Sequence, residues 1–254
     1  MNAEYKAFIE YLGRMAGDVI RPYFFNSSLT VELKGDASPV TIADRQAEQV
    51  IRAEINKRYP SHGIIAEEFG NENENAEFVW VIDPIDGTIS FTTGCPLFGT
   101  LIGLLHNGKP VLGLIYQPVI DQMCIGDNTL TTVNNKPVRV REVENLSLAT
   151  VLTTDVTNIE KYQNLANYEQ LRRQVRITRT WGDCYGYLLV ASGMADVMMD
   201  PVMNPWDLLP IIPVVRGAGA VISAWDGSDP LTANSSVAAA PKLHAEVIRI
   251  LNGK

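Results

Sequence analysis

The spacing of apolar and polar positions in the N-terminal part of the chain predicts two helices joined by a turn. Apolar residues recur at helical intervals over residues 3–21, which is typical of an amphipathic helix. A second helix is expected over residues 42–58, ending before Tyr59-Pro60. Between them, LKGDASPVT (33–41) is rich in turn-forming residues and predicts a polar turn.

The remainder of the chain predicts a meander of strands followed by strands that alternate with helices. Asn107-Gly108 is a strong signal for a tight hairpin turn, and NENEN (71–75) is expected to be a solvated loop. The predicted strands are 63–66, 78–82, 98–106, 109–117, 121–126, 149–153, 174–178, 196–199 and 220–223. The predicted helices are 158–171, 183–192, 206–217 and 241–251. This combination favours a layered α/β fold over a purely parallel sheet.

Composition narrows the class of protein. The chain has 254 residues, 46% of them hydrophobic, and a net charge of -8. Such an acidic chain is a poor candidate for unspecific nucleic-acid binding, which relies on basic patches. No apolar run approaches the roughly 18–20 residues that a membrane span requires. The three cysteines show no CxxC spacing and the N-terminus shows no signal-peptide core, so we expect a reduced, cytoplasmic protein.

The segment WVIDPIDGT places two aspartates three residues apart at the end of an apolar run. Two carboxylates this close repel each other in a low-dielectric setting, whereas a bound cation would turn that cost into affinity. Pro84, between Asp83 and Asp86, is expected to end the strand because it cannot donate to a ladder. Gly87 and Thr88 then suit a helix start that faces an anion. The segment therefore predicts a metal site.

Two other segments supply acids at similar positions. Glu67 follows a short apolar run in IIAEEFG, and Asp207 opens a predicted helix in NPWDLLP. Oxygen-only ligands of this kind suit Mg²⁺ or Mn²⁺ rather than zinc. Taken singly, Glu67 is better explained by a solvated loop, and Asp207 is better explained by a helix cap.

These segments together carry a resemblance to a known family. WVIDPIDGT, the upstream AEE, KGDASPVTIAD from Lys34 to Asp44 and the late WD are similar in order and spacing to the inositol monophosphatase superfamily of Mg²⁺-dependent phosphatases. The resemblance implies an αβαβα sandwich of the inositol monophosphatase and fructose-1,6-bisphosphatase type. It also implies a single domain over residues 1–254, with packed lobes of about 1–145 and 146–254, and a homodimer.

The same resemblance implies roles for individual residues. The expected metal-binding set is Glu67, Asp83, the backbone carbonyl of Ile85, Asp86 and Asp207. Glu67, Thr88 and Asp44 are expected to be catalytic by orienting the water that attacks phosphorus in line. Two or three Mg²⁺ ions per site are implied, with Mn²⁺ as a substitute. Phosphate is expected at Gly87 and Thr88.

Local features favour one substrate within the superfamily. RTWGDCYGY (179–187) resembles histidinol-phosphate phosphatases, and Ser90 departs from the Asn of many inositol monophosphatases. Asp183 and Asp200 are extra carboxylates that would pair with the ammonium and imidazole of histidinol phosphate. The alternative is structural: Asp183 caps a helix and Asp200 ends a strand. The expected substrate-binding residues are Asp86, Gly87, Thr88, Ser90, Asp183, Asp200, Asn204 and Asp207.

Two rival functions stay open from the sequence. One is an inositol-1-phosphatase of broad specificity. The other is a regulatory partner of the transcription machinery, in which catalysis is secondary. A docking role of that kind would show a basic or apolar face, and the nearest candidate is EQLRRQVRITR (169–179), which reads more simply as a helix end followed by a strand.

Overall fold

The computed structural model describes residues 3–33, 35 and 39–254. Lys34, Asp36 and Ser38 of the predicted turn, and of the motif that starts at Lys34, lie outside the described residues. On either side of them, β1 (Val31–Leu33) pairs antiparallel with β2 (Pro39–Thr41), so the flanks of the turn form a short hairpin that the sequence did not predict.

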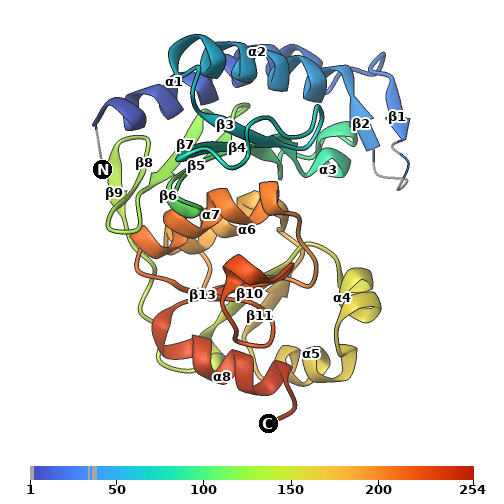
Figure 1. Ribbon diagram of the computed structural model, residues 1–254. Helices are drawn as coiled ribbons and strands as arrows, with labels where there is room; N and C mark the ends of the chain where they lie inside the picture. Colours follow the sequence, from blue (N-terminus) through green and yellow to red (C-terminus); the bar gives the residue numbers. More distant parts are fainter. Residues whose placement is uncertain (1–2, 34, 36–38) are drawn as a thin grey trace.

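Two helices cover one face of a seven-stranded sheet (Figure 1). α1 (Ala3–Ile20) and α2 (Ile42–Arg58) confirm the first two predicted helices. The sheet order is β3-β4-β5-β6-β7-β8-β9. Its strands are β3 (Gly63–Ala66), β4 (Phe78–Asp86), β5 (Gly99–His106), β6 (Lys109–Gln117), β7 (Gln122–Gly126), β8 (Thr131–Val133) and β9 (Lys136–Val138).

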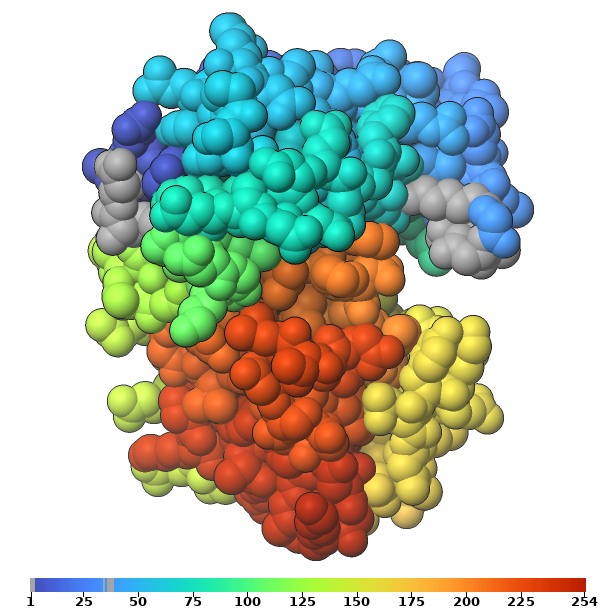
Figure 2. All heavy atoms as spheres, in the orientation of Figure 1, coloured from blue at the N-terminus to red at the C-terminus, as the bar shows by residue number. Residues whose placement is uncertain are grey.

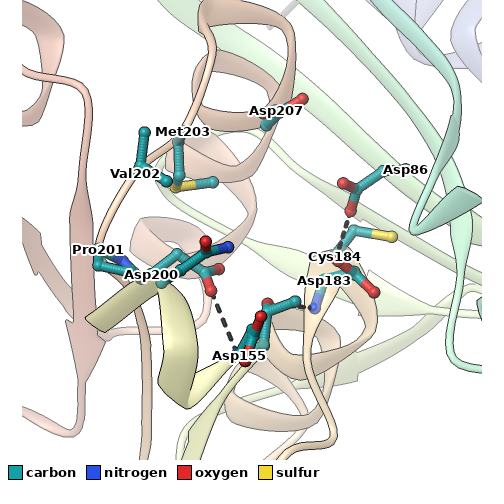
Figure 3. A pocket seen from close by; sticks show the side chains of 11 residues that line it. Asp86, Asp155, Asp183, Cys184, Asp200, Pro201, Val202, Met203 and Asp207 are labelled. Carbon is teal, nitrogen blue, oxygen red and sulfur yellow. Dashed lines mark hydrogen bonds between the residues drawn. The ribbon is translucent and has the colours of Figure 1, made fainter. Parts of the chain in front are cut away.

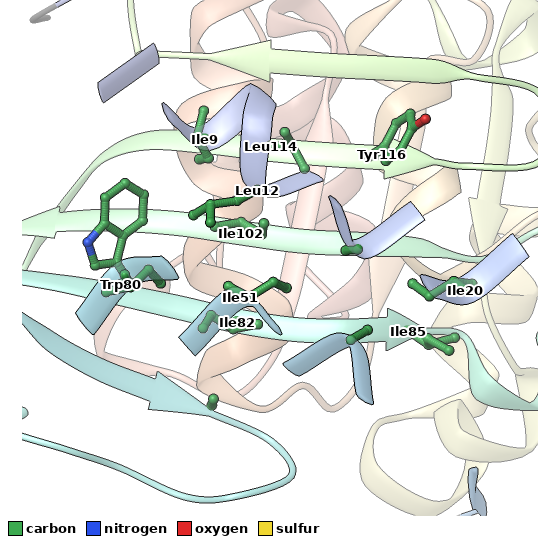
Figure 4. Close-up of a cluster of buried hydrophobic side chains, with 14 of the residues drawn as sticks. Ile9, Leu12, Ile20, Ile51, Trp80, Ile82, Ile85, Ile102, Leu114 and Tyr116 are labelled. Carbon is green, nitrogen blue, oxygen red and sulfur yellow. The ribbon is translucent and has the colours of Figure 1, made fainter. Parts of the chain in front are cut away.

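The core beneath these helices follows directly from the alternation of residues along the strands. Trp80 and Ile82 of β4 point to the same face and meet Leu12 of α1 and Ile51 of α2, all fully buried (Figure 4). Burying a side chain of this size contributes about 1.5–3 kcal/mol. The other face of the sheet carries apolar residues too, because a second helical layer covers it.

That second helical layer consists of α6 (Asp183–Ala191) and α7 (Pro205–Gly217). α7 lies so close to β5 and β6 that a Cβ on Gly113 would stand 1.9 Å from the carbonyl oxygen of Pro210. Glycine at this strand position therefore allows the contact, which places the start of α7 beside the end of β4.

A five-stranded sheet and outer helices complete the molecule. The sheet order is β11-β10-β12-β14-β13, with strands β10 (Thr150–Thr153), β11 (Ile177–Arg179), β12 (Val197–Asp200), β13 (Val221–Ser223) and β14 (Ser236–Ala239). Its outer face is covered by α4 (Val156–Tyr162), α5 (Leu165–Arg172) and α8 (Pro241–Leu251). The expected αβαβα sandwich is confirmed.

Several expected boundaries are wrong. The single helix at 158–171 is two helices, because Asn164 caps the second by accepting from the backbone N–H of Asn167 (3.2 Å). The strand expected at 174–178 is β11, which begins only at Ile177 and ends at Arg179. β4 continues through Pro84 instead of ending at 82, since the register shifts between Asp83 and Asp86. The hydroxyl of Thr100 donates to the Pro84 carbonyl at 2.8 Å within that irregularity.

Of the helices in the described part of the chain, none has the length and apolar character that a membrane span requires.

Candidate metal and substrate site

The ends of β4 and α7 bring three carboxylates together. Asp83 and Asp86 lie on either side of the irregularity in β4, and Asp207 is the third residue of α7. One oxygen from each lies within 4.8 Å of the others. The backbone N–H of Ile85 donates to Asp83 (3.0 Å), which fixes that carboxylate, and the N–H of Asn204 donates to Asp207 (2.8 Å). Chain segments 124 residues apart thus form one acidic cluster.

Electrostatics show that this cluster suits a divalent cation. Burial, followed by repulsion from Glu67, raises the pKa of Asp83 well above its ordinary value. Burial, followed by Asp183, does the same to the pKa of Asp86, and burial raises the pKa of Asp207 to about 7. Each shift records the cost of an uncompensated negative charge. An oxygen-only donor set with this excess of charge fits Mg²⁺ or Mn²⁺.

Glu67 lies beside the cluster, as expected for a further ligand. It follows β3, and its backbone N–H donates to the carbonyl of Ile82 (3.3 Å), which holds the residue next to β4. Its charge contributes to the raised pKa of both Asp83 and Asp44. Glu67 and Thr88 also line a common pocket.

Asp44 and Thr88, the expected water-orienting pair, occupy the starts of two helices. Asp44 belongs to a capping box at the start of α2, where it accepts from the N–H (2.8 Å) and hydroxyl (2.6 Å) of Thr41. Burial raises the pKa of Asp44 to about 6. Thr88 begins α3 (Thr88–Thr92), and its hydroxyl donates to the carbonyl of Ile85 (3.1 Å). The carbonyl expected to bind metal therefore contacts the threonine expected to bind water.

Gly87 is required where α3 meets α6. Its φ of 87° lies in the left-handed region, and a Cβ there would stand 2.8 Å from a carboxylate oxygen of Asp183. Asp183 itself has a φ of 49°, and Ser90 donates to its carboxylate at 3.5 Å. Burial, with smaller effects from Asp200 and Asp207, raises the pKa of Asp183 to about 7. The two segments therefore place a further carboxylate above the start of α3.

Asp200 ends β12 and is almost entirely buried. It accepts from the hydroxyl of Tyr187 (2.9 Å) and the N–H of Thr154 (3.3 Å). Tyr187 is itself fully buried. Asn204 is the N-cap residue of α7. It is not among the described residues that line the two pockets of the next paragraph.

Two adjoining pockets connect these groups. One, of about 150 Å³, is lined by Asp86, Asp183, Asp200 and Asp207 (Figure 3). The other, of about 350 Å³, is lined by residues that include Glu67, Gly87, Thr88 and Ser90. Thr154, Asp155 and Asp183 line both. Figure 2 shows the surface hollowed between the blue part of the chain near β1 and the yellow part that contains α4 and α5.

Sequence reasoning missed several polar residues of these walls, three of them in one segment. Thr154 and Asp155 follow β10, and Asn158 lies in the first turn of α4. Asp155 caps α4 by accepting from the N–H of Thr157 (2.8 Å). The signal was present in TTDVTN, an acid between a strand and a helix, which is the same arrangement that drew attention to Asp86.

Comparison with known proteins agrees with this geometry. The sequence profile described as the inositol monophosphatase family matches residues 1–253. The chain belongs to the inositol monophosphatase family. It is 43% identical over 232 residues to a chloroplastic bifunctional phosphatase of Arabidopsis thaliana, covering 90% of this chain and 66% of that protein. It is 37% identical to a histidinol-phosphatase of Chlorobaculum parvum, covering 89% of this chain and 90% of the relative.

A solved structure extends the likeness to three dimensions. An inositol monophosphatase from Zymomonas mobilis superposes with a TM-score of 0.87 at 34% identity, covering 99% of this chain and 100% of that chain. The protein is therefore a phosphatase of this family, and enzymes of this family use Mg²⁺. The acidic cluster of Asp83, Asp86 and Asp207 is a place where such an ion fits.

Proposed function

We propose that this phosphatase hydrolyses histidinol phosphate to histidinol and phosphate, as a step of histidine biosynthesis. The observation that carries the proposal is the common pocket of Asp86, Asp207, Asp183 and Asp200. The first two belong to a metal site that suits the phosphate, and the other two are carboxylates beyond it. A substrate with phosphate at one end and an ammonium and an imidazole at the other matches that division of charge. The likeness to a histidinol-phosphatase supports the same substrate.

The proposed metal-binding groups are Glu67, Asp83, Asp86 and Asp207 together with the carbonyl of Ile85, and we propose two or three ions per site. Bound Mg²⁺ would neutralise phosphate oxygens and make a water more acidic. The carboxylates of the chain supply the negative charge that retains the cations. Because their metal-free pKa values are raised, protons compete with the metal for these groups at mildly acidic pH.

Thr88 and Glu67 are proposed to hold the attacking water. The hydroxyl hydrogen of Thr88 is directed at the carbonyl of Ile85, so its oxygen lone pairs are left to accept a hydrogen from water. Glu67 supplies a carboxylate acceptor on the wall of the same pocket. Asp44 adds a buried carboxylate nearby, whose partner Thr41 keeps it at the start of α2. Gly87 and Thr88 are proposed to contact the phosphate.

Substrate recognition is proposed to come from Asp183 and Asp200, with Ser90 and Asn204 as further proposed substrate contacts. Asp200 already accepts two hydrogen bonds from the protein, and each carboxylate oxygen still has a lone pair for a substrate cation. Asp183 contacts both pockets, which places it between the phosphate end and the rest of the substrate. We further propose that the enzyme is cytoplasmic and homodimeric, with lobes of about 1–145 and 146–254.

An inositol-1-phosphatase of broad specificity is the second candidate. It is favoured by the likeness to the inositol monophosphatase of Zymomonas mobilis, which covers the whole fold. The two functions differ only in what the carboxylates beyond the metal site contact. A regulatory role in transcription would in contrast be independent of the metal-binding aspartates.

Genetic complementation tests the proposal. Expression of the chain in a bacterium that lacks its own histidinol-phosphate phosphatase should restore growth without histidine. The Asp83→Asn variant, expressed at the same level, should not. Growth only in the presence of histidine, with wild-type protein present and folded, would contradict the proposal. Growth supported equally by Asp83→Asn would exclude metal-dependent catalysis as its cause.

A further inference from the structure

A charged pair is buried in the middle of α2, away from the pockets. Glu48 has no exposed surface, and Arg52, one turn later, is only 7% exposed. Arg52 donates from Nε to Oε1 of Glu48 at 2.7 Å. Burying two charges is costly unless all their hydrogen-bonding groups are satisfied. What satisfies them here is the loop that follows β3.

The carboxylate of Glu48 accepts two backbone N–H groups of that loop. Oε2 accepts from Glu68 at 2.8 Å, and Oε1 accepts from Phe69 at 3.0 Å. These are the two residues that directly follow Glu67. A side chain of α2 therefore determines where the backbone leaves β3, at the position of the proposed metal ligand.

Arg52 holds the other end of the same loop. It donates to the carbonyl of Gly70 and, through Nη1, to the carboxylate of Glu72 at 2.7 Å. Figure 1 shows α2 lying over the edge of the sheet that β3 and β4 form. The pair thus attaches the loop at both ends to a helix that also carries Asp44, one turn before Glu48.

We propose that Glu48 and Arg52 are positioning residues for the metal site. Glu48 fixes the loop so that Glu67 faces Asp83. Metal affinity then depends on the carboxylate of Glu48, although its oxygens contact the loop and Arg52 and would not bind the metal. The inference rests on the metal-binding role proposed for Glu67. Groups that orient a metal ligand from behind typically change metal affinity or activity by about 10–100-fold when they are replaced.

Glu48→Gln is the first test, because it keeps the shape of the side chain. Its amide oxygen can retain Phe69 and Arg52, which leaves an NH₂ group facing the N–H of Glu68. Binding of Mn²⁺ is measured by isothermal titration calorimetry without substrate, so the readout is independent of activity. We expect the dissociation constant of the affected site to rise about 10–100-fold. Activity at saturating Mg²⁺ should recover to near the wild-type value.

Glu10→Gln is the matched control. Glu10 and Arg14 form the same i,i+4 pair on α1 (3.1 Å), with Arg14 half exposed and with no contact to the loop. The Mn²⁺ affinity of the Glu10→Gln variant should equal that of wild type. Arg52→Lys is a second variant that retains a positive charge beside Glu48 but gives up contacts to the loop. It should weaken Mn²⁺ binding in the same direction, and it is the variant to compare if Glu48→Gln does not fold.

The outcomes separate the inference from the proposed function. Weaker Mn²⁺ binding in Glu48→Gln or Arg52→Lys, with faster amide hydrogen exchange confined to residues 67–72, supports the positioning role. Folded variants that bind Mn²⁺ as tightly as wild type, whatever their melting temperatures, overturn it and leave the metal site intact. Absence of Mn²⁺ binding by the wild-type protein would overturn the metal site and this inference together.

Discussion

In the metal-free protein, the free energy of unfolding should fall as pH rises from 5 to 8. The cause is the group of buried and partly buried carboxylates that would face one another without a cation. Asp183 and Asp207 each have a pKa raised to about 7, by burial first and by other factors that include neighbouring carboxylates. In the unfolded chain both would ionise near 3.8.

The sign and size of the effect follow from proton linkage. Between these two pKa values the folded state holds protons that the unfolded state has released, so the free energy of unfolding falls as pH rises. One group of this kind loses about 2.5 kcal/mol between pH 5 and 8, since each pKa unit corresponds to about 1.4 kcal/mol. In a chain of this length, that loss lowers the melting temperature by about 5–10 °C.

The assay is thermal unfolding followed by circular dichroism, in excess chelator and in excess Mg²⁺, at several pH values. His62 and His244 act in the opposite direction, because burial lowers their pKa values. The informative quantity is therefore the difference between wild type and Asp207→Asn, which should have a flatter pH dependence in chelator. Asp226→Asn, which changes an exposed carboxyl whose pKa is lowered, is the control. Identical slopes for wild type and Asp207→Asn, or a slope that Mg²⁺ leaves unchanged, would refute the reasoning.

Three sets of substitutions test the roles proposed at the site. Asp83→Asn or Asp86→Asn should abolish turnover while circular dichroism shows a folded protein, and full activity of wild type in excess EDTA would contradict the metal requirement. Thr88→Ala should lower kcat by about 10²–10⁴-fold with little change in KM; near-normal kcat with weaker binding would assign the hydroxyl to ground-state binding instead. Asp183→Asn or Asp200→Asn should lower kcat/KM for histidinol phosphate by roughly 10–150-fold, the equivalent of a charge-assisted hydrogen bond of about 1.5–3 kcal/mol. Glycerol 2-phosphate is the control ester for both, and equal losses on the two esters would point to a structural role.

The elements with strong local signals were predictable from the sequence. α1, α2 and the hairpin of β5 and β6 have long apolar patterns or an Asn-Gly turn, and they occur where expected. Two of the short strands, β8 and β14, were missed because their three or four residues show no recognisable apolar period. Their pairing is decided by distant neighbours.

The candidate site shows the same division between local and distant information. Asp83 and Asp86 were found because two acids at the end of an apolar run conflict with the local rules. The continuation of β4 through Pro84 was not predictable, since it depends on Thr100 in the neighbouring strand. The attachment of the loop after β3 to Glu48 was likewise hidden, because nothing in α2 indicates which backbone groups its buried acid contacts.

Steady-state phosphate release with two substrates tests the central claim most directly. The quantity is the ratio of kcat/KM for histidinol phosphate to kcat/KM for inositol 1-phosphate, measured in Mg²⁺ with the same enzyme preparation. If Asp183 and Asp200 pair with the cationic end of the substrate, histidinol phosphate should be preferred by at least about 10-fold, the lower bound of one charge-assisted hydrogen bond. A ratio at or below one would contradict the account and assign the pocket to inositol phosphates.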